Sequence, residues 1–484
     1  MHPAGLTRAG RPAASDPDRS ERTAMTTPDP FSAALADRLQ RAWHETPTGA
    51  GLVSITLAAP EVCFRGLPRL DGPYWYWARP ETETYLLGLG EAWRSEASGE
   101  GRLDTLARSF EALRRRWQRL DPDSQGTAPP CFTGIAFDPD DPMEGPWQGF
   151  PNALLAVPEV VLRRDGNHCT LTFTAEAGGG GETVARWLAV AGRLLGALQC
   201  PPDPSGTRTP LTRILSDPEE SEWIGLIEQA NRDIEAGAID KVVPARRIRV
   251  CAERRLDGHR LLAALGYMYP CCMLFAANLG GRTVASATPE RLVTRHGDEV
   301  VSDAIGGTAR RAPNERHDQE LGDALQGSRK ARHEHALVVE AIRAALAPVC
   351  EELSIPDAPR IYRLRHLQHL WTPVRGRAPR ESGLLDLARR LHPTPAVGGT
   401  PRAAALDWLQ RHGELQRGWY SGAVGWLDAD GHGELAVLLR CALVNGECAD
   451  LYAGAGIVSA SDPEAELAET ALKLEAMLEA LENA

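Results

Sequence analysis

The chain has 484 residues, a formal net charge of −12 and 24% charged residues. This is the composition of a globular protein with room for one large unit or for two to three domains. The acidic excess argues against a nucleic-acid or anionic-membrane partner. The sequence contains no run of about eighteen apolar residues, so it predicts no membrane-spanning helix.

The ten cysteines are scattered along the chain, with Cys271 and Cys272 adjacent and no C-x-x-C pair. This pattern indicates neither a disulfide framework nor a zinc cluster, so we expect reduced thiols in a cytoplasmic protein. Residues 1–24 are polar, rich in Pro and Arg, and lack the apolar stretch of a signal peptide. We therefore expect a disordered extension over 1–30, which is consistent with a natural start at Met25.

Helix and strand patterns are interspersed in the first half of the chain. Apolar periodicity predicts helices over 31–45, 102–120 and 182–198. Strands are predicted in GLVSITLAAP, PYWYWARP, TETYLLGLG, CFTGIAFDP, NALLAVPEVVLRR and HCTLTFTA. Residues 199–215 are rich in Pro and Ser, which predicts a linker between one region at 31–205 and a second at 216–484.

Hairpins dominate the second half. Helices are predicted over 218–236, 256–265 and 328–346, and a strand over 240–250, where Pro244 removes a backbone donor. Strands in ERLVTR and EVVSDAIGGTARR flank a turn at His296-Gly297-Asp298, and GELAVLLRCALV faces CADLYAG across Asn445-Gly446. Because no βαβ alternation is present, we expect the α+β class.

The last thirty-odd residues combine a glycine loop with a polar helix. Gly454-Ala455-Gly456 follows a strand, and Ser461 with Glu464 fits a capping box in which Pro463 occupies the first helical turn. An apolar stripe is predicted for Leu467, Ala471, Leu474, Leu478 and Leu481. A different face carries Glu466, Glu469 and Lys473. These residues suit either a solvated helix face or a divalent cation with an anionic ligand.

Five further residues suit chemistry, although each one alone also fits an ordinary structural role. Arg440 lies in the strand pattern LAVLLRCALV, on a face with Leu438 and Ala442, where it either forms a structural ion pair or clamps a carboxylate. Glu334, between two histidines, is either a surface residue or a ligand for Mg²⁺. The structural alternatives for Lys241, Glu290 and His369 are a surface lysine, a turn carboxylate and a satisfied histidine.

Motifs in a fixed order favour the chemical interpretation. Over residues 241–473 they read KVVPAR, ATPERL, IGGTARR, KARHEHALV, LQHLWTPVRG, LHPTPAVGG, RGWYSGAVGW, LLRCAL and AGAGIVSASDPEAELAET. Together they resemble the chorismate-utilising enzymes, which include anthranilate, aminodeoxychorismate, salicylate and isochorismate synthases. Residues 45–165 resemble more loosely the amino-terminal half of menaquinone-type isochorismate synthases.

The resemblance implies a large two-layer antiparallel sandwich with helices packed outside and the active site between the sheets. Residues 31–205 would form its amino-terminal half, and 216–484 the chorismate-binding catalytic region. Glu334 and Glu469, helped by Glu466, would hold Mg²⁺ against the ring carboxylate of chorismate. His369 would line the site beside the ring and is counted among the implied catalytic residues. The residues implied to bind the substrate are Arg440, Tyr420, Lys473, Ala396, Gly307, Thr308, Gly454, Ala455 and Gly456.

The nucleophile separates the reactions of this family. Lys241 resembles the general base that activates water in isochorismate and salicylate synthases, where anthranilate synthases carry glutamine and use ammonia. Aminodeoxychorismate synthases carry a lysine beside the GT pair, where this chain reads AIGGT. Glu290 resembles the general acid that protonates the departing C4 hydroxyl. A lysine is a base only without its proton, which burial and nearby positive charge favour.

The segment LHPTPAVGG favours isochorismate over salicylate as the product. Salicylate synthases carry threonine where this chain has Ala396. The resemblance therefore implies a magnesium-dependent isochorismate synthase, whose product feeds menaquinone, siderophore or salicylate synthesis. A salicylate synthase and a catalytically silent chorismate-binding relative remain the alternatives. Because the chain has no glutamine-amidotransferase segment, we expect a monomeric enzyme that works alone.

Overall fold

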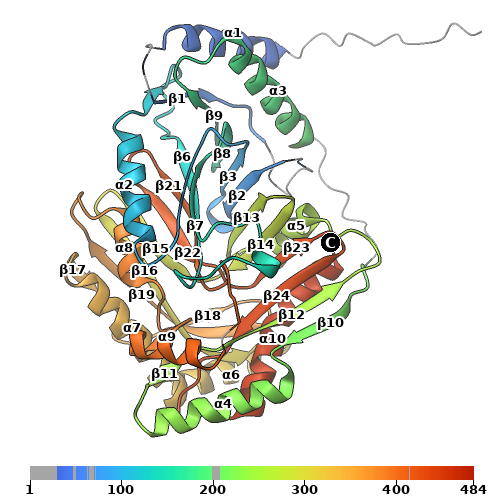
Figure 1. Cartoon of the computed structure of the whole chain (residues 1–484), viewed down its shortest axis with the longest axis vertical. Coiled ribbons are helices and arrows are strands. Elements are labelled where there is room, and N and C mark those ends of the chain that lie inside the picture. Colours follow the sequence, from blue (N-terminus) through green and yellow to red (C-terminus); the bar gives the residue numbers. More distant parts are fainter. Residues whose placement is uncertain are drawn as a thin grey trace, which may run out of the picture.

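The computed structural model describes residues 30–484 except 47, 48, 50, 63, 65–69, 71, 199–207, 414 and 460. Two large β-sheets form its framework, and helices cover their outer sides (Figure 1). The predicted α+β sandwich is therefore confirmed. The extension expected over 1–30 lies outside the described residues, apart from its last residue.

The first sheet has twelve strands taken from both halves of the chain. In spatial order they are β10 (Thr212–Asp217), β12 (Ala245–Cys251), β24 (Cys448–Gly454), β23 (Cys441–Asn445), β14 (Arg282–Thr288), β13 (Met273–Leu279), β2 (Tyr74–Arg79), β3 (Thr84–Leu89), β8 (Val160–Asp165), β9 (His168–Glu176), β1 (Leu52–Ala58) and β5 (Gln118–Leu120). The pairs are antiparallel, except that β1 and β5 run parallel.

The second sheet has ten strands and likewise combines both halves. Its order is β17 (Glu351–Ser354), β19 (Leu367–Arg377), β16 (Glu299–Arg310), β15 (Arg291–His296), β22 (Gly433–Val437), β21 (Ala423–Asp428), β6 (Pro130–Ile135), β7 (Ala153–Val157) and β4 (Trp93–Ala97), and β18 (Arg360–Arg363) also pairs with β19. A separate two-stranded ribbon joins β11 (Lys241–Val242) to β20 (Gly399–Thr400).

Two groups of helices bury the outer faces of the sheets. Those packed on the first sheet are α1 (Pro30–His44), α3 (Gly181–Leu198), α5 (Gly258–Met268) and α10 (Pro463–Glu482). Those packed on the second are α2 (Arg102–Arg114), α7 (Arg329–Leu346) and α8 (Leu384–Leu391), whereas α4 (Glu220–Glu235) packs on α10 and α9 (Arg402–Arg411) on the strands β11 and β20. Helix α6 (Glu315–Gly327) lies beside α7. No described helix is long and apolar enough to cross a membrane.

The aromatic strand β2 shows how the layers form. Tyr74 and Tyr76 join the core under the outer helices, whereas Trp75 and Trp77 join the core between the two sheets. Successive side chains of a strand point to opposite faces, so one strand supplies both cores. The inner core therefore consists of side chains from facing strands, which keeps the two sheets in contact.

The strand predicted over GELAVLLRCALV is two strands in different sheets. β22 belongs to the second sheet and β23 to the first, and the chain crosses between them at residues 438–440. Arg440 has a φ of 47°, the left-handed region that an extended strand does not use. The prediction that it shares a strand face with Leu438 and Ala442 is therefore wrong. The hairpin turns at Gly297 and Gly446, both with a φ of 63°, are confirmed.

The cap of the last helix also differs from the prediction. Asp462, not Ser461, is the capping residue, because its carboxylate accepts a hydrogen bond from Ala465 N at 2.8 Å. The Ser461 hydroxyl instead accepts one from Val458 N at 3.2 Å. Pro463 does occupy the first helical turn, as predicted. The predicted capping box between Ser461 and Glu464 is therefore wrong.

Several predicted boundaries shift. The helix expected over 102–120 ends at Arg114, because residues 118–120 form β5 instead. The linker expected over 199–215 falls partly outside the described residues, and its end is the start of β10. In the stripe predicted on the last helix, Leu474 and Leu481 are buried, but Ala471 is exposed. Helices α6, α8 and α9 were not predicted.

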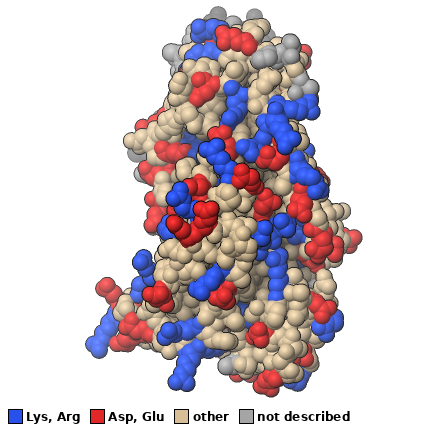
Figure 2. All heavy atoms as spheres, turned by 90° about the vertical axis from the view of Figure 1, so that its left-hand side faces the viewer, with Lys and Arg blue, Asp and Glu red and all other residues tan. Residues whose placement is uncertain are grey.

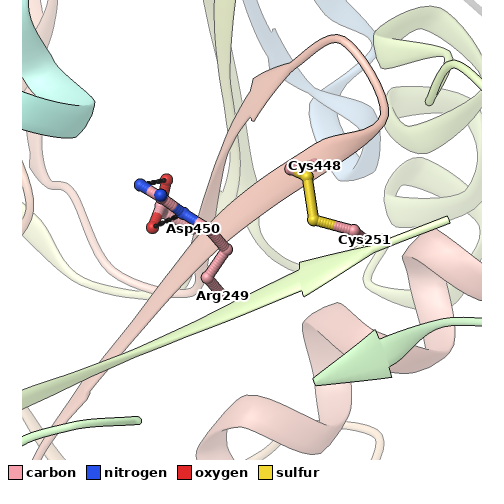
Figure 3. Close-up of a disulfide and its surroundings, with 4 residues drawn as sticks. All are labelled: Arg249, Cys251, Cys448 and Asp450. Atoms are coloured by element: carbon pink, nitrogen blue, oxygen red, sulfur yellow. Dashed lines mark hydrogen bonds and ion pairs between the residues drawn. A yellow bond between two sulfur atoms is a disulfide. The ribbon is translucent and has the colours of Figure 1, made fainter. Parts of the chain in front are cut away.

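A disulfide joins Cys251 to Cys448, which corrects the expectation that all cysteines are reduced. The two residues lie directly opposite each other on β12 and β24 (Figure 3). Beside them, the Arg249 guanidinium donates two hydrogen bonds to Asp450, at 2.9 and 3.0 Å. The bonded cysteines are 197 residues apart in sequence. Spacing alone could not reveal this pair, because only the pairing of the strands brings the two together.

Acidic and basic side chains are interspersed on the surface. Figure 2 shows both signs of charge distributed over one face of the molecule. Among the described residues many exposed charges form ion pairs, such as Arg119 with Asp430 and Arg389 with Asp104. Such exposed pairs contribute little to stability.

Candidate active site

The short strand β11 places Lys241 deep inside the protein. Its side chain is 0% exposed, and its Nζ lies 2.9 Å from Glu334 Oε1 on α7. The strand is fixed on both sides, because Lys241 pairs with Thr400 and Val242 exchanges backbone hydrogen bonds with Ile457. Lys241 is therefore held in one position rather than extended on the surface.

The segment after Lys241 explains the role of Pro244 in the fold. The ladder is interrupted between β11 and β12, and the Pro244 carbonyl accepts a hydrogen bond from Ala455 N at 3.3 Å. The glycine loop therefore lies against this segment. A Cβ atom at position 456 would lie 2.5 Å from Glu334 Oε1 and 2.9 Å from Lys241 Cε. Only glycine allows this close approach of the backbone.

Glu290 follows β14 and is 3% exposed. Burial raises the pKa of Glu290 to about 8; the Lys241 ammonium opposes this rise, and the Asp303 carboxylate adds to it. The Thr394 hydroxyl lies 3.5 Å from Glu290 Oε1. At neutral pH the Glu290 carboxyl therefore keeps its proton, which is the state that a general acid requires.

His369 links three of the predicted substrate-holding residues. Arg440 Nη2 lies 3.0 Å from His369 Nε2, and His369 Nδ1 lies 3.2 Å from the Gly307 carbonyl and 3.3 Å from Thr308 Oγ1. A guanidinium can only donate, so Nε2 accepts, and the ring proton sits on Nδ1 and is donated to Gly307. Burial lowers the pKa of His369 to about 3, with help from Arg440 and Lys473. The imidazole is therefore neutral at neutral pH and holds Arg440 in place.

The predicted polar face of α10 is present in the structure. Lys473 Nζ lies 2.8 Å from Glu469 Oε1 and donates to the Gly454 carbonyl at 2.8 Å. Burial acts to raise the pKa of Glu469, but Lys473, His369 and Lys330 together outweigh it, so that pKa lies below its usual value. Burial and the neighbouring Glu469 raise the pKa of Glu466, whose Oε1 lies 2.7 Å from Lys330 Nζ.

The remaining predicted residues lie less centrally. Tyr420 is buried and stacks on Tyr452 with ring centroids 5.2 Å apart. A Cβ atom at Gly454 would lie 3.4 Å from the Tyr420 hydroxyl, so the ring reaches the glycine loop. Ala396 packs against the core under the outer helices. In the same segment the Thr394 hydroxyl lies near Glu290, and Gly399 lies close to the backbone of Lys241.

Sequence reasoning missed two residues of this cluster, Thr394 and Lys330. Thr394 carried no signal besides its place in LHPTPAVGG. Lys330 did carry one, because it lies one helical turn before Glu334 and is one of only three lysines in the chain. The structure brings these residues together with the predicted set.

Comparison with known proteins identifies first the class of fold and then the family to which the chain belongs. Its two-sheet sandwich is the fold of solved isochorismate and anthranilate synthases. Within that class, the chain belongs to the family of chorismate binding enzymes, whose match covers residues 37–482. The predicted family and the prediction that the chain is an enzyme are thereby confirmed.

Individual relatives agree with this assignment. The salicylate biosynthesis isochorismate synthase of Pseudomonas aeruginosa is 38% identical over 414 residues, which cover 84% of this chain and 85% of that protein. Isochorismate synthase MenF of Bacillus subtilis is 30% identical over 424 residues, covering 86% and 89%.

Solved structures give the same fold. MenF, the menaquinone-specific isochorismate synthase from Escherichia coli, matches with a TM-score of 0.76 and 27% identity over 93% of this chain and 99% of that one. Anthranilate synthase component I from Streptococcus pneumoniae matches with a TM-score of 0.66 and 20% identity over 85% and 93%. At that identity the second likeness shows the fold alone.

Proposed function

We propose that the protein is an isochorismate synthase, an isomerase that adds water at C2 of chorismate while the C4 hydroxyl leaves. One observation carries this proposal: Glu290, a buried acid with a pKa of about 8, lies within the field of Lys241, a buried lysine. An acid and a base are what the exchange of two hydroxyl groups requires. The names of the Pseudomonas aeruginosa and Bacillus subtilis relatives support the same reaction.

Glu290 is the proposed general acid. Its carboxyl is neutral at neutral pH because burial disfavours the charged form, so it can protonate the leaving C4 hydroxyl. The carboxylate that remains after this transfer interacts favourably with the Lys241 ammonium. The positive charge of Lys241 therefore stabilises the negative charge that Glu290 acquires when it loses its proton.

Lys241 is the proposed general base, which takes a proton from the attacking water. The hydrogen bonds on both sides of β11 fix its backbone, and Glu334 fixes its Nζ at 2.9 Å. Proton transfer depends on such fixed geometry as much as on the acidity of the groups. Only the neutral amine form of this lysine can take that proton.

The other end of the site is the proposed holder of the substrate carboxylates. A guanidinium has five N–H donors, so the bond from Arg440 to His369 orients the group and leaves it able to bind a carboxylate. Lys473 and Tyr420, with the backbone at Gly307, Thr308 and the glycine loop, complete the proposed set.

Magnesium is the proposed cofactor, held by Glu334 and Glu469 with Glu466 binding directly or through water. Among the described residues no three acidic, histidine or cysteine side chains form a ready metal cluster, and each of these glutamates pairs with a lysine. Their chemistry fits the ion, because carboxylates are its preferred ligands and all three act on one ammonium, that of Lys330. The bound ion would polarise the substrate through its ring carboxylate.

Product analysis tests the proposed reaction. Purified protein with chorismate and Mg²⁺, and without ammonia or glutamine, should form isochorismate, and the same equilibrium mixture should be reached from isochorismate. Chromatography with authentic standards separates the products. Salicylate and pyruvate as the main products would instead identify a salicylate synthase. No turnover with intact chorismate binding would identify a silent relative.

A further inference from the structure

The use of lysine in this chain is highly selective. Of its 53 lysine and arginine residues, only Lys241, Lys330 and Lys473 are lysines. Each of the three contacts one of the glutamates to which the Mg²⁺ site is assigned: Lys241 with Glu334 at 2.9 Å, Lys330 with Glu466 at 2.7 Å and Lys473 with Glu469 at 2.8 Å. All other ion pairs among the described residues therefore use arginine or histidine.

This selectivity indicates that a compact ammonium is needed at all three positions. Arginine carries a larger, planar group that binds a carboxylate through two parallel hydrogen bonds. Lysine is a point charge on a flexible stem, and it can move from one partner to another. The proposed function already gives roles to Lys241 and Lys473, whereas Lys330 has none.

Lys330 lies in the first turn of α7 and reaches across to α10. Its side chain is 38% exposed, whereas that of its partner Glu466 is 4% exposed. Burial lowers the pKa of Lys330, but Glu466, Glu334 and Glu469 together raise it above its usual value. Its ammonium therefore lies within the field of all three carboxylates, which come from two different helices.

We propose that Lys330 is a positioning residue that acts as a built-in cation of the carboxylate cluster and is exchanged for a divalent cation when that ion binds. This inference rests on the proposed function, which assigns Glu334, Glu466 and Glu469 to Mg²⁺. Without a cation the three carboxylates repel one another, and Lys330 offsets that repulsion across the contact between α7 and α10. A divalent cation supplies the same charge compensation, so the two compete.

The exchange predicts a particular response to substitution. In Lys330→Met the competitor is absent, so Mg²⁺ should bind at least about fivefold more tightly than to the wild type. The metal-free variant should unfold at a lower temperature, and saturating Mg²⁺ should raise its Tm by more than it raises that of the wild type. In Lys330→Arg the forked guanidinium should hold Glu466 more firmly, and Mg²⁺ should bind more weakly.

Titration calorimetry with MgCl₂ on the purified full chain, without chorismate, measures this affinity independently of turnover. The matched control is Arg332→Met, which removes one positive charge from an exposed position of the same helix turn. Circular dichroism on each variant checks the fold. The proposal predicts tighter binding for Lys330→Met alone, weaker binding for Lys330→Arg, and wild-type binding for Arg332→Met.

Other outcomes would overturn it. Mg²⁺ affinity that is equal or weaker in Lys330→Met than in the wild type would remove the competition and leave the proposed function intact. If Arg332→Met increased the affinity for Mg²⁺ as much as Lys330→Met does, the effect would be a general consequence of removing positive charge and not of competition by Lys330. Absence of Mg²⁺ binding to both wild type and Lys330→Met would overturn the inference together with the metal assignment, whereas product analysis would still decide the reaction.

Discussion

The two ends of the candidate active site are both buried, yet they hold protons in opposite ways. At the Lys241 end, burial raises the pKa of Glu290 to about 8, so this acid keeps its proton. At the Arg440 end, burial lowers the pKa of His369 to about 3, so the imidazole takes up no second proton. In both cases the low-dielectric interior favours the neutral form. The same physical cause therefore provides a proton donor at one end and a fixed acceptor at the other.

The largest effect is expected from the carboxylates to which Mg²⁺ binding is assigned. Glu334→Gln, beside Lys241, and Glu469→Gln, beside Lys473, should each abolish measurable Mg²⁺-dependent turnover, because each removes a charged oxygen ligand. Assays over a range of Mg²⁺ concentrations would test this, with exposed Glu340→Gln on α7 as the control. Near-normal turnover of either variant at low Mg²⁺ would contradict the metal-binding role and favour the alternative that these glutamates belong to a solvated helix face.

The second largest effect is expected from substitution of the proposed general acid, Glu290, and the proposed general base, Lys241. Glu290→Gln and Lys241→Ala should each lower kcat by about 10²–10⁴-fold and change KM less, since neither is proposed to hold a carboxylate. In the wild type the rate should fall as the pH rises above about 8, because Glu290 then loses the proton that it must donate. Steady-state kinetics from pH 6 to 10 provide the measurement. Full kcat in Lys241→Ala would remove the base from the mechanism.

A smaller effect with the contrasting signature is expected at the other end. Arg440→Ala should raise KM by roughly tenfold or more and affect kcat less, because an ion pair to a substrate carboxylate is lost. His369→Leu, which removes the acceptor that orients Arg440, should raise KM in the same direction by less. Arg365→Ala, which breaks a partly exposed pair with Glu479, is the control and should change neither constant. A drop in kcat without a rise in KM would contradict the proposed holding role.

The smallest effect concerns stability. The pKa of Glu290 rises from its usual 4.5 to about 8 in the folded protein, so folding favours the proton, and stability falls as pH increases between these two values. Gln at position 290 carries no charge at any pH. The Tm of Glu290→Gln should therefore exceed that of the wild type by an amount that grows above pH 4.5 and levels off above about pH 8. A constant difference across this range would argue against the raised pKa.

Local sequence patterns predict many helices, strands and hairpins, but not where the chain passes from one sheet to the other. Glycine in a turn requires only local geometry, so the hairpins at Gly297 and Gly446 follow from the sequence. Alternation along a strand says nothing about which sheet receives each part of it, so the crossing at Arg440 was invisible. The Cys251–Cys448 disulfide was hidden for a related reason, because only the register of two distant strands brings the cysteines together.

The candidate site divides in a similar way. Helical spacing alone places Glu466, Glu469 and Lys473 on one face, and the structure agrees. The roles assigned to Lys241, Glu290 and Arg440 came from the family motifs and stay predictions. Spacing could not reveal that Glu290 is buried within the field of Lys241, since that depends on how distant strands meet. Lys330 was missed because its segment was interpreted through the neighbouring histidines.

The distribution of strands between the sheets also determines how the protein can be made. In the first sheet β2 pairs with β13, and in the second β6 pairs with β21, so each sheet is completed across partners far apart in the chain. When only the first half has been synthesised, the edges of β2 and β6 are therefore unpaired. Unpaired strand edges can form hydrogen bonds with other chains and cause aggregation. Such a nascent chain is a natural client for chaperones. A fragment cut at the 199–215 segment inherits the same open edges, so the halves should be produced together.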